Sequence, residues 1–95
     1  MRAARAGIRF VVRPRLARQP LEAQTTLRLA AVVGRTADVD VLISASEADE
    51  ESVLDALEAG LLAGLLDEPA PGAVRFSHVL VRDTIYEDVP RIRRV

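Results

Sequence analysis

The fold of this chain is decided by the stretch Arg75-Phe-Ser-His-Val-Leu-Val-Arg-Asp-Thr-Ile-Tyr-Glu-Asp88. Residues 74–76, at its beginning, have the β-branched and aromatic side chains of a short strand. Ser77 is a good helix N-cap, because its hydroxyl can accept a hydrogen bond from a backbone N–H two or three residues on. The stretch therefore predicts a strand that passes directly into a capped helix.

This predicted helix holds the only histidine of the chain. Val81 and Ile85 recur at helical spacing, which puts His78 in the first turn, on the face that it shares with Val81, Arg82 and Ile85. Two interpretations of His78 are open: a side chain partly buried between strand and helix, or a polar contact across the face of the domain to which Arg82 adds charge. Arg75 and Arg82 are equally well explained as ordinary surface residues.

Two helices are expected upstream of this stretch. Residues 3–18 carry apolar side chains at helical spacing, with Pro14 as a kink or a boundary. A second helix should begin at Pro20 or Leu21 and stop at Gly34. Its second half is apolar nearly all round, so we expect this helix to be central and buried.

Two further helices are expected before the strand. Asp38 is a credible N-cap for a short helix over residues 39–45, and Asp49 for a helix over residues 50–63. We expect the later helix to turn a leucine stripe inward and to end at Gly64. The stripe consists of Leu54, Leu57 and Leu61, supported by Val53 and Leu62.

A small hairpin completes the predicted fold. Leu65-Leu66 predicts a first strand, residues 69–72 a turn, and residues 74–76 the returning strand. About five helices with a two-stranded β-hairpin describe a mainly α fold, the winged helix-turn-helix, in which the hairpin is the wing. The predicted organisation is a basic N-terminal helix (1–19), a winged-helix domain (20–90) and a basic tail (91–95).

Charges are segregated along the sequence. Residues 1–35 hold eight arginines and one acid, residues 36–74 hold ten acids and no base, and residues 75–95 hold five arginines and three acids. Such blocks either face each other in the fold or face partners of opposite charge. The mean hydropathy of +0.14 is high for so short a chain and indicates apolar surface that expects a partner.

The composition excludes most catalytic classes. With no cysteine, no lysine and one histidine, the chain has no thiolate chemistry, no P-loop and no convincing metal cluster. We expect no enzyme activity, no cofactor and no metal. We expect a cytoplasmic protein without a membrane partner, because cysteines are absent and the longest apolar run is far shorter than the roughly 20 residues of a membrane span.

The helix predicted before the wing is acidic. In a winged helix this element enters the major groove of DNA, yet residues 49–64 carry five carboxylates and no base. A solvated acidic face explains this pattern best, and we expect no DNA reading by this helix. The Arg-rich residues 2–18 could still bind nucleic acid without sequence specificity.

Several runs of residues carry a family resemblance. They are Leu27-Arg-Leu-Ala-Ala-Val-Val-Gly-Arg-Thr-Ala-Asp-Val-Asp-Val-Leu42, Val53-Leu-Asp-Ala-Leu-Glu-Ala59, Ala63-Gly-Leu-Leu66 and Arg75-Phe-Ser-His-Val-Leu-Val-Arg-Asp-Thr-Ile-Tyr-Glu87. In this order they resemble the winged-helix subdomain of bacterial STAND-type ATPases. Those proteins are large regulators with an ATPase core, and many carry LuxR-type DNA-binding or adenylate cyclase domains.

The resemblance implies a role for the end of the chain. In that family the subdomain follows the ATPase core and helps to hold the ADP-bound resting state closed. The resemblance assigns to His78 a contact with the phosphates of the nucleotide, with Arg75 and Arg82 as candidate supporting residues; Tyr86 matches a recurrent residue without an assigned role. Ala37 departs from the pattern, because a bulky aromatic residue commonly stands there.

The ATPase parts of the family pattern are missing from the chain. It has no P-loop, no acidic metal-binding strand and no output domain, so we expect a separately encoded piece of such a regulator. The expected function is a non-catalytic regulatory module that packs against an ATPase core or another protein, or that self-associates. Two alternatives are a small DNA-binding transcriptional regulator that uses the Arg-rich N-terminal helix and the tail Arg91–Arg94, and an inactive gene remnant.

Overall fold

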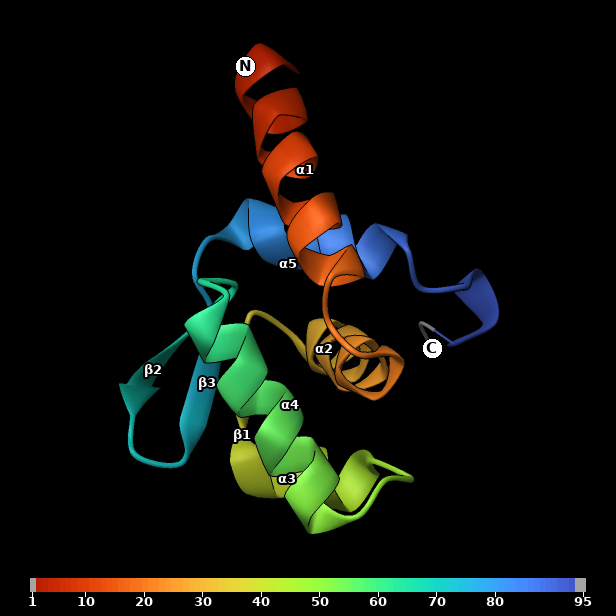
Figure 1. Cartoon of the computed structure of the whole chain (residues 1–95), viewed down its shortest axis with the longest axis vertical. Coiled ribbons are helices and arrows are strands. Elements are labelled where there is room, and N and C mark those ends of the chain that lie inside the picture. The colour runs from red at the N-terminus through yellow and green to blue at the C-terminus, as the bar shows by residue number, and fades with distance from the viewer. Residues whose placement is uncertain (1, 94–95) are drawn as a thin grey trace.

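The structure is a computed structural model that describes residues 2–93, with the side chains of residues 7 and 10–92. The fold is mainly helical with a small antiparallel sheet, as expected (Figure 1). Met1 and residues 94–95 of the predicted tail lie outside the described residues. In chain order the elements are α1 (Arg2–Ala17), α2 (Leu21–Val33), β1 (Thr36–Asp38), α3 (Val39–Ala45), α4 (Glu50–Leu62), β2 (Leu66–Ala70), β3 (Ala73–Phe76), α5 (Val79–Glu87) and a 3₁₀ helix (Arg91–Arg93).

The sheet has three strands in the order β1-β3-β2, so the predicted two-stranded hairpin is incomplete. β1 lies antiparallel to β3, with Thr36 opposite Arg75. Three residues are too few to show the alternation that marks a strand in a sequence, which is why β1 was not expected. β2 is longer than predicted and runs through Pro69, and only Pro71 and Gly72 form the turn.

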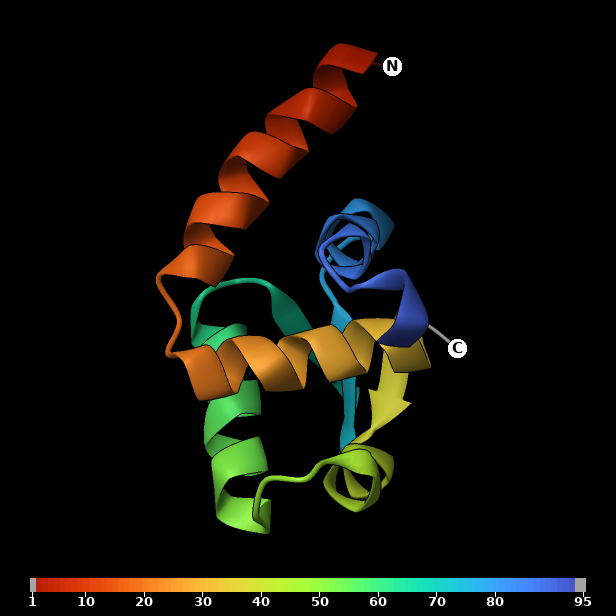
Figure 2. The ribbon, with the colours of Figure 1, turned by 90° about the vertical axis from the view of Figure 1, so that its right-hand side faces the viewer.

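The core is built around α2, which packs against α4, α5, β1 and α3 (Figure 2). Its predicted bounds and central place are confirmed, with Gly34 as the residue that ends it. The largest fully buried side chains come from six different segments and meet on this helix. They are Leu27, Leu42, Val53, Leu65, Phe76 and Ile85.

The face that α4 turns inward differs from the predicted leucine stripe. Its buried residues are Val53, Ala56, Leu57 and Gly60. A Cβ on Gly60 would lie 2.8 Å from Leu66 Cδ1 and 3.1 Å from Leu27 Cδ2, so a small residue is needed where α4 meets α2 and β2. This close approach sets the rotation of α4 and turns Leu54 and Leu62 outward.

Of the two aspartates predicted to cap helices, one forms its capping hydrogen bond and the other does not. Asp49 caps α4 as predicted, because its Oδ1 accepts a hydrogen bond of 2.9 Å from the backbone N–H of Ser52. Asp38 occupies the N-cap position of α3, yet its side chain makes no capping hydrogen bond. The first N–H of α3, that of Val39, instead donates to the Gly72 carbonyl in the β2–β3 turn at 2.8 Å. The β2–β3 turn thus satisfies the N–H of Val39, and the capping bond predicted for Asp38 is not formed.

The first helix, α1, continues through Pro14 to Ala17, so the predicted boundary at Pro14 is wrong. Val12 and Leu16 are buried in the core cluster, and the helix packs against α5. At 3.8 Å, Arg13 and Asp88 form an ion pair that joins α1 to the end of α5. The beginning of α1 extends away from the body of the molecule in both views (Figures 1 and 2).

Candidate functional site

His78 is the N-cap of α5, a position that the sequence analysis gave to Ser77. Its Nδ1 accepts a hydrogen bond of 3.0 Å from the backbone N–H of Leu80. Ser77 instead donates its hydroxyl hydrogen to the Gly64 carbonyl at 3.0 Å, and its backbone N–H bonds to the Leu65 carbonyl. Because these bonds hold Ser77 beside the residues that precede β2, the helix begins one residue later than predicted.

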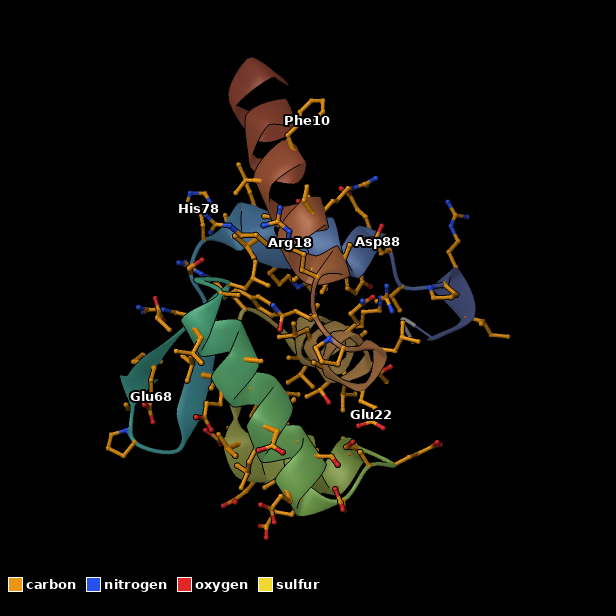
Figure 3. All side chains as sticks on the ribbon, viewed as in Figure 1. Phe10, Arg18, Glu22, Glu68, His78 and Asp88 are labelled. Atoms are coloured by element: carbon orange, nitrogen blue, oxygen red, sulfur yellow. The ribbon has the colours of Figure 1, made fainter. Side chains whose placement is uncertain are left out.

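The imidazole of His78 is exposed and lies at the edge of the molecule (Figure 3). The interpretation of a partly buried histidine is therefore wrong. Since Nδ1 accepts a hydrogen bond, the neutral ring carries its proton on Nε2. The described residues provide no hydrogen bond to Nε2. The ring thus presents one N–H donor to solvent or to a partner.

The Arg82 side chain is bound within the fold and does not present its guanidinium to a partner. Its Nε donates to the Ala31 carbonyl at 2.8 Å, and its guanidinium lies 4.2 Å from the centre of the Tyr86 ring. The carbonyl of Ala31 is one of the last four of α2, which have no partner inside their own helix. Arg82 therefore satisfies the end of α2 and complements its dipole. An ion pair with Asp83, at 3.4 Å, completes its contacts.

Arg75 belongs to the β2–β3 hairpin. Its Nε and one terminal nitrogen donate to the two carboxylate oxygens of Asp67 at 3.0 and 3.3 Å, across the β2–β3 pair. This is the paired geometry in which arginine binds a carboxylate most specifically. Of the three residues that the sequence singled out, Arg75 and Arg82 are engaged in contacts within the fold, whereas the exposed ring of His78 has no hydrogen bond from its Nε2–H to the described residues. The structure does not bring the three side chains together into one binding site.

Sequence reasoning expected a solvated acidic face on α4 but missed the leucines that lie on it. We call the acidic face the five exposed residues on this side of the helix, which combine carboxylates with apolar side chains: Glu51, Leu54, Asp55, Glu58 and Leu62. Leu62 is 84% exposed and Leu54 45%. The acids at positions 51, 55 and 58 have helical spacing and mark this outer face in the sequence. Leu54 and Leu62 were nevertheless predicted to lie in the core.

An open groove lies between α2, the α3–α4 turn and Val89–Pro90. Its volume is about 610 Å³, and Glu22, Arg28 and Glu47 contribute its charged groups. The Nε of Arg28 is buried without a hydrogen-bond partner, while one terminal nitrogen donates to Gln24 at 3.4 Å. Among the described side chains, no three metal-binding groups gather there or elsewhere. No helix in the described range could cross a membrane.

Comparisons of the chain with family models, with curated proteins and with solved structures gave no match. The likeness to STAND-type ATPases thus rests on the residues quoted above.

Proposed function

We propose that the chain is a non-catalytic winged-helix interaction module, similar to a piece of a STAND-type ATPase regulator, that packs against a partner protein. The order of elements from α2 to β3 supports this proposal. A helix, a strand, two helices and a hairpin follow one another, and β1 adds to the open side of β3. Two helices before a wing are the arrangement of a winged helix-turn-helix.

The observation that carries the proposal is the charge of α4. In DNA-binding members of this fold class, the helix before the wing lies in the major groove. Here its outer face presents Glu51, Asp55 and Glu58, and phosphates would be repelled by these carboxylates. The exposed Leu54 and Leu62 on the same face suit a protein surface that is apolar and basic.

His78 supplies the regulatory part of the proposal. In the family that the chain resembles, a histidine in this position contacts the phosphates of a nucleotide held by the ATPase core. The exposed Nε2–H side of the His78 ring supports such a contact with a ligand that another protein holds. We expect the isolated chain to bind ADP weakly or not at all. Micromolar ADP binding in calorimetry, lost on His78→Ala, would contradict this expectation.

Titration of labelled duplex DNA in fluorescence anisotropy tests the proposed function. We expect weak binding, independent of sequence, that disappears as salt increases. Asp55→Asn and Glu58→Asn remove two charges from the acidic face and should strengthen this background. The pair Asp40→Asn and Glu68→Asn, which changes the same charge elsewhere, is the matched control.

A small DNA-binding regulator is the alternative, and the composition of α1 favours it. This helix contains arginines and no acid. Tight binding that distinguishes one DNA sequence from another, and that Arg15→Gln and Arg18→Gln abolish, would establish this alternative and overturn the interaction module.

A further inference from the structure

The Arg-rich helix α1 and the acidic helix α4 do not cover each other. In Figures 1 and 2, α1 and α4 extend toward opposite ends of the molecule, with α2 between them. The one hydrogen bond described between the two regions is made by Arg15, which donates to the Ala63 carbonyl at 3.4 Å, after the end of α4. Apart from this contact at their near ends, the two helices extend away from each other.

The outward side of α1 joins apolar and basic groups. Phe10 is 78% exposed and Val11 49%. Phe10 lies on the part of the helix that extends from the body (Figure 3). Arg15, on the next turn, and Arg18, the residue after the end of α1, are also exposed. We call the residues Phe10, Val11, Arg15 and Arg18 the basic face.

The basic face and the acidic face match in kind and in size. Each has two exposed large apolar side chains among charges of a single sign. The helices that carry them have 16 and 13 residues, so they are about 24 and 20 Å long. A basic apolar helix is the partner that the acidic face fits, and α1 of this chain, with Phe10 and Val11 exposed, is such a helix.

We propose that the acidic face of α4 is a docking surface for α1 of a second copy of this chain. This inference rests on the proposed function, because it assigns the partner of the same face of α4. When two copies lie side by side in antiparallel orientation, a two-fold axis between them places each α1 beside the α4 of the other. The dimer is then closed and contains the contact twice. The apolar side chains supply affinity, and the charges fix which helices meet.

Sedimentation velocity of the full chain at low and high salt tests the inference. At about 0.01 M salt, where charges act over about 30 Å, we expect a dimer. At about 1 M salt, where they act over about 3 Å, we expect its dissociation constant to increase at least about tenfold. A chain that sediments as a monomer at low salt, at concentrations up to the millimolar range, overturns the proposal.

Charge-swap variants identify the two faces. Arg15→Glu with Arg18→Glu reverses the basic face, and Asp55→Arg with Glu58→Arg reverses part of the acidic face. Each double variant alone should be monomeric at low salt, and a mixture of the two should form a heterodimer, because the reversed faces are again complementary. Arg35→Glu with Arg91→Glu, and Asp40→Arg with Glu68→Arg, change the same charges elsewhere and should leave the dimer intact. Circular dichroism confirms that each variant is folded.

The outcomes separate this inference from the proposed function. If the mixture of folded variants stays monomeric, the second copy is not the occupant of the acidic face. The interaction module then still stands or falls with the DNA titration described above. If DNA binding is tight and specific while the wild type is monomeric, both proposals are wrong.

Discussion

At the scale of single residues, Arg82 does more for the fold than its place in a sequence motif suggests. It joins the middle of α5 to the last turn of α2 through the Ala31 carbonyl. It also stacks on Tyr86, from the next turn of its own helix. Because the guanidinium satisfies a carbonyl that α2 cannot satisfy itself, its loss leaves a polar group without a partner.

Arg82→Met should therefore destabilise the protein by about 1.5–3 kcal/mol, the range of hydrogen bonds to charged groups. The methionine keeps most of the apolar stem, so the change isolates the guanidinium. Urea denaturation, followed by the midpoint at constant slope, measures the effect. Arg91→Met, at an exposed position outside the helices of the core, is the control and should change stability by less than about 0.5 kcal/mol. Equal effects of the two variants would contradict this role.

His78 has a structural task besides the proposed contact with a ligand. His78→Ala removes the acceptor for the Leu80 N–H and should cost about 0.5–2 kcal/mol of stability, as for other N-caps. His78→Asn keeps a capping oxygen and should restore most of this loss. Thermal denaturation of the three proteins gives the comparison. If alanine and asparagine destabilise equally, the cap does not contribute as the geometry indicates.

At the scale of elements, α4 is the helix that the sequence defined best. Its N-cap and its end before Gly64 follow from local chemistry, and both are found. Its rotation does not, because that depends on how closely α4 approaches α2 and β2 at Gly60. A leucine stripe can be recognised in a sequence. A close contact that depends on the absence of a side chain, as at Gly60, cannot.

Gly60→Ala should destabilise the protein by about 1–3 kcal/mol, because the added methyl group crowds two buried leucines at the helix contact. Gly7→Ala is the matched control on α1, where a Cβ meets nothing within 4 Å. There the higher helix propensity of alanine should stabilise by up to about 1 kcal/mol. Chemical denaturation of both variants measures these changes in stability. A stabilising Gly60→Ala would show that the leucines can move aside.

Asp49 makes the stability of α4 depend on pH. Hydrogen bonds from Ser52, first from its side chain and then from its backbone N–H, hold the pKa of the Asp49 carboxyl below its ordinary value of 3.8. The carboxylate is the form that the fold prefers. Its contribution is complete above the pKa of the unfolded chain and is lost as the pH falls through the lower folded value.

Asp49→Asn keeps a capping oxygen without this titration. The difference in stability between wild type and variant should be constant from about pH 7 to about pH 5 and should shrink below about pH 4. Thermal melts across this range measure it. A difference that grows on acidification would contradict the sign.

At the scale of the whole molecule, the sequence predicted which segments are helical but not how they meet. The start and stop signals at Pro20, Gly34 and Asp49 predicted the bounds of α2 and α4 well, because such signals act locally. β1 exists because β3 offers it a partner, and no local signal marks it. The candidate site followed the same rule. His78 was found as the only histidine, but its exposure and its cap depend on Ser77 being tied to Gly64.

The positions of the charge blocks in the fold could not be predicted from the sequence either. The sequence left open whether they meet within the chain or face outward. In the packed molecule α2, from the basic block, contacts α4, whereas α1 and α4 extend toward opposite ends, which favours the outward alternative for these two helices (Figure 1).

The two free edges of the sheet are poor sites for pairing with strands of another molecule. Its free edges are β1, with three residues, and β2, which carries Pro69 and an irregular register between Asp67 and Ala70. Short strands, proline and charge are the means by which proteins prevent strands of neighbouring molecules from adding to a sheet. Fibril-like growth through this sheet is thus discouraged. A chain that associates through its helices can remain a discrete assembly, because the edges of this sheet do not favour the open-ended addition of strands.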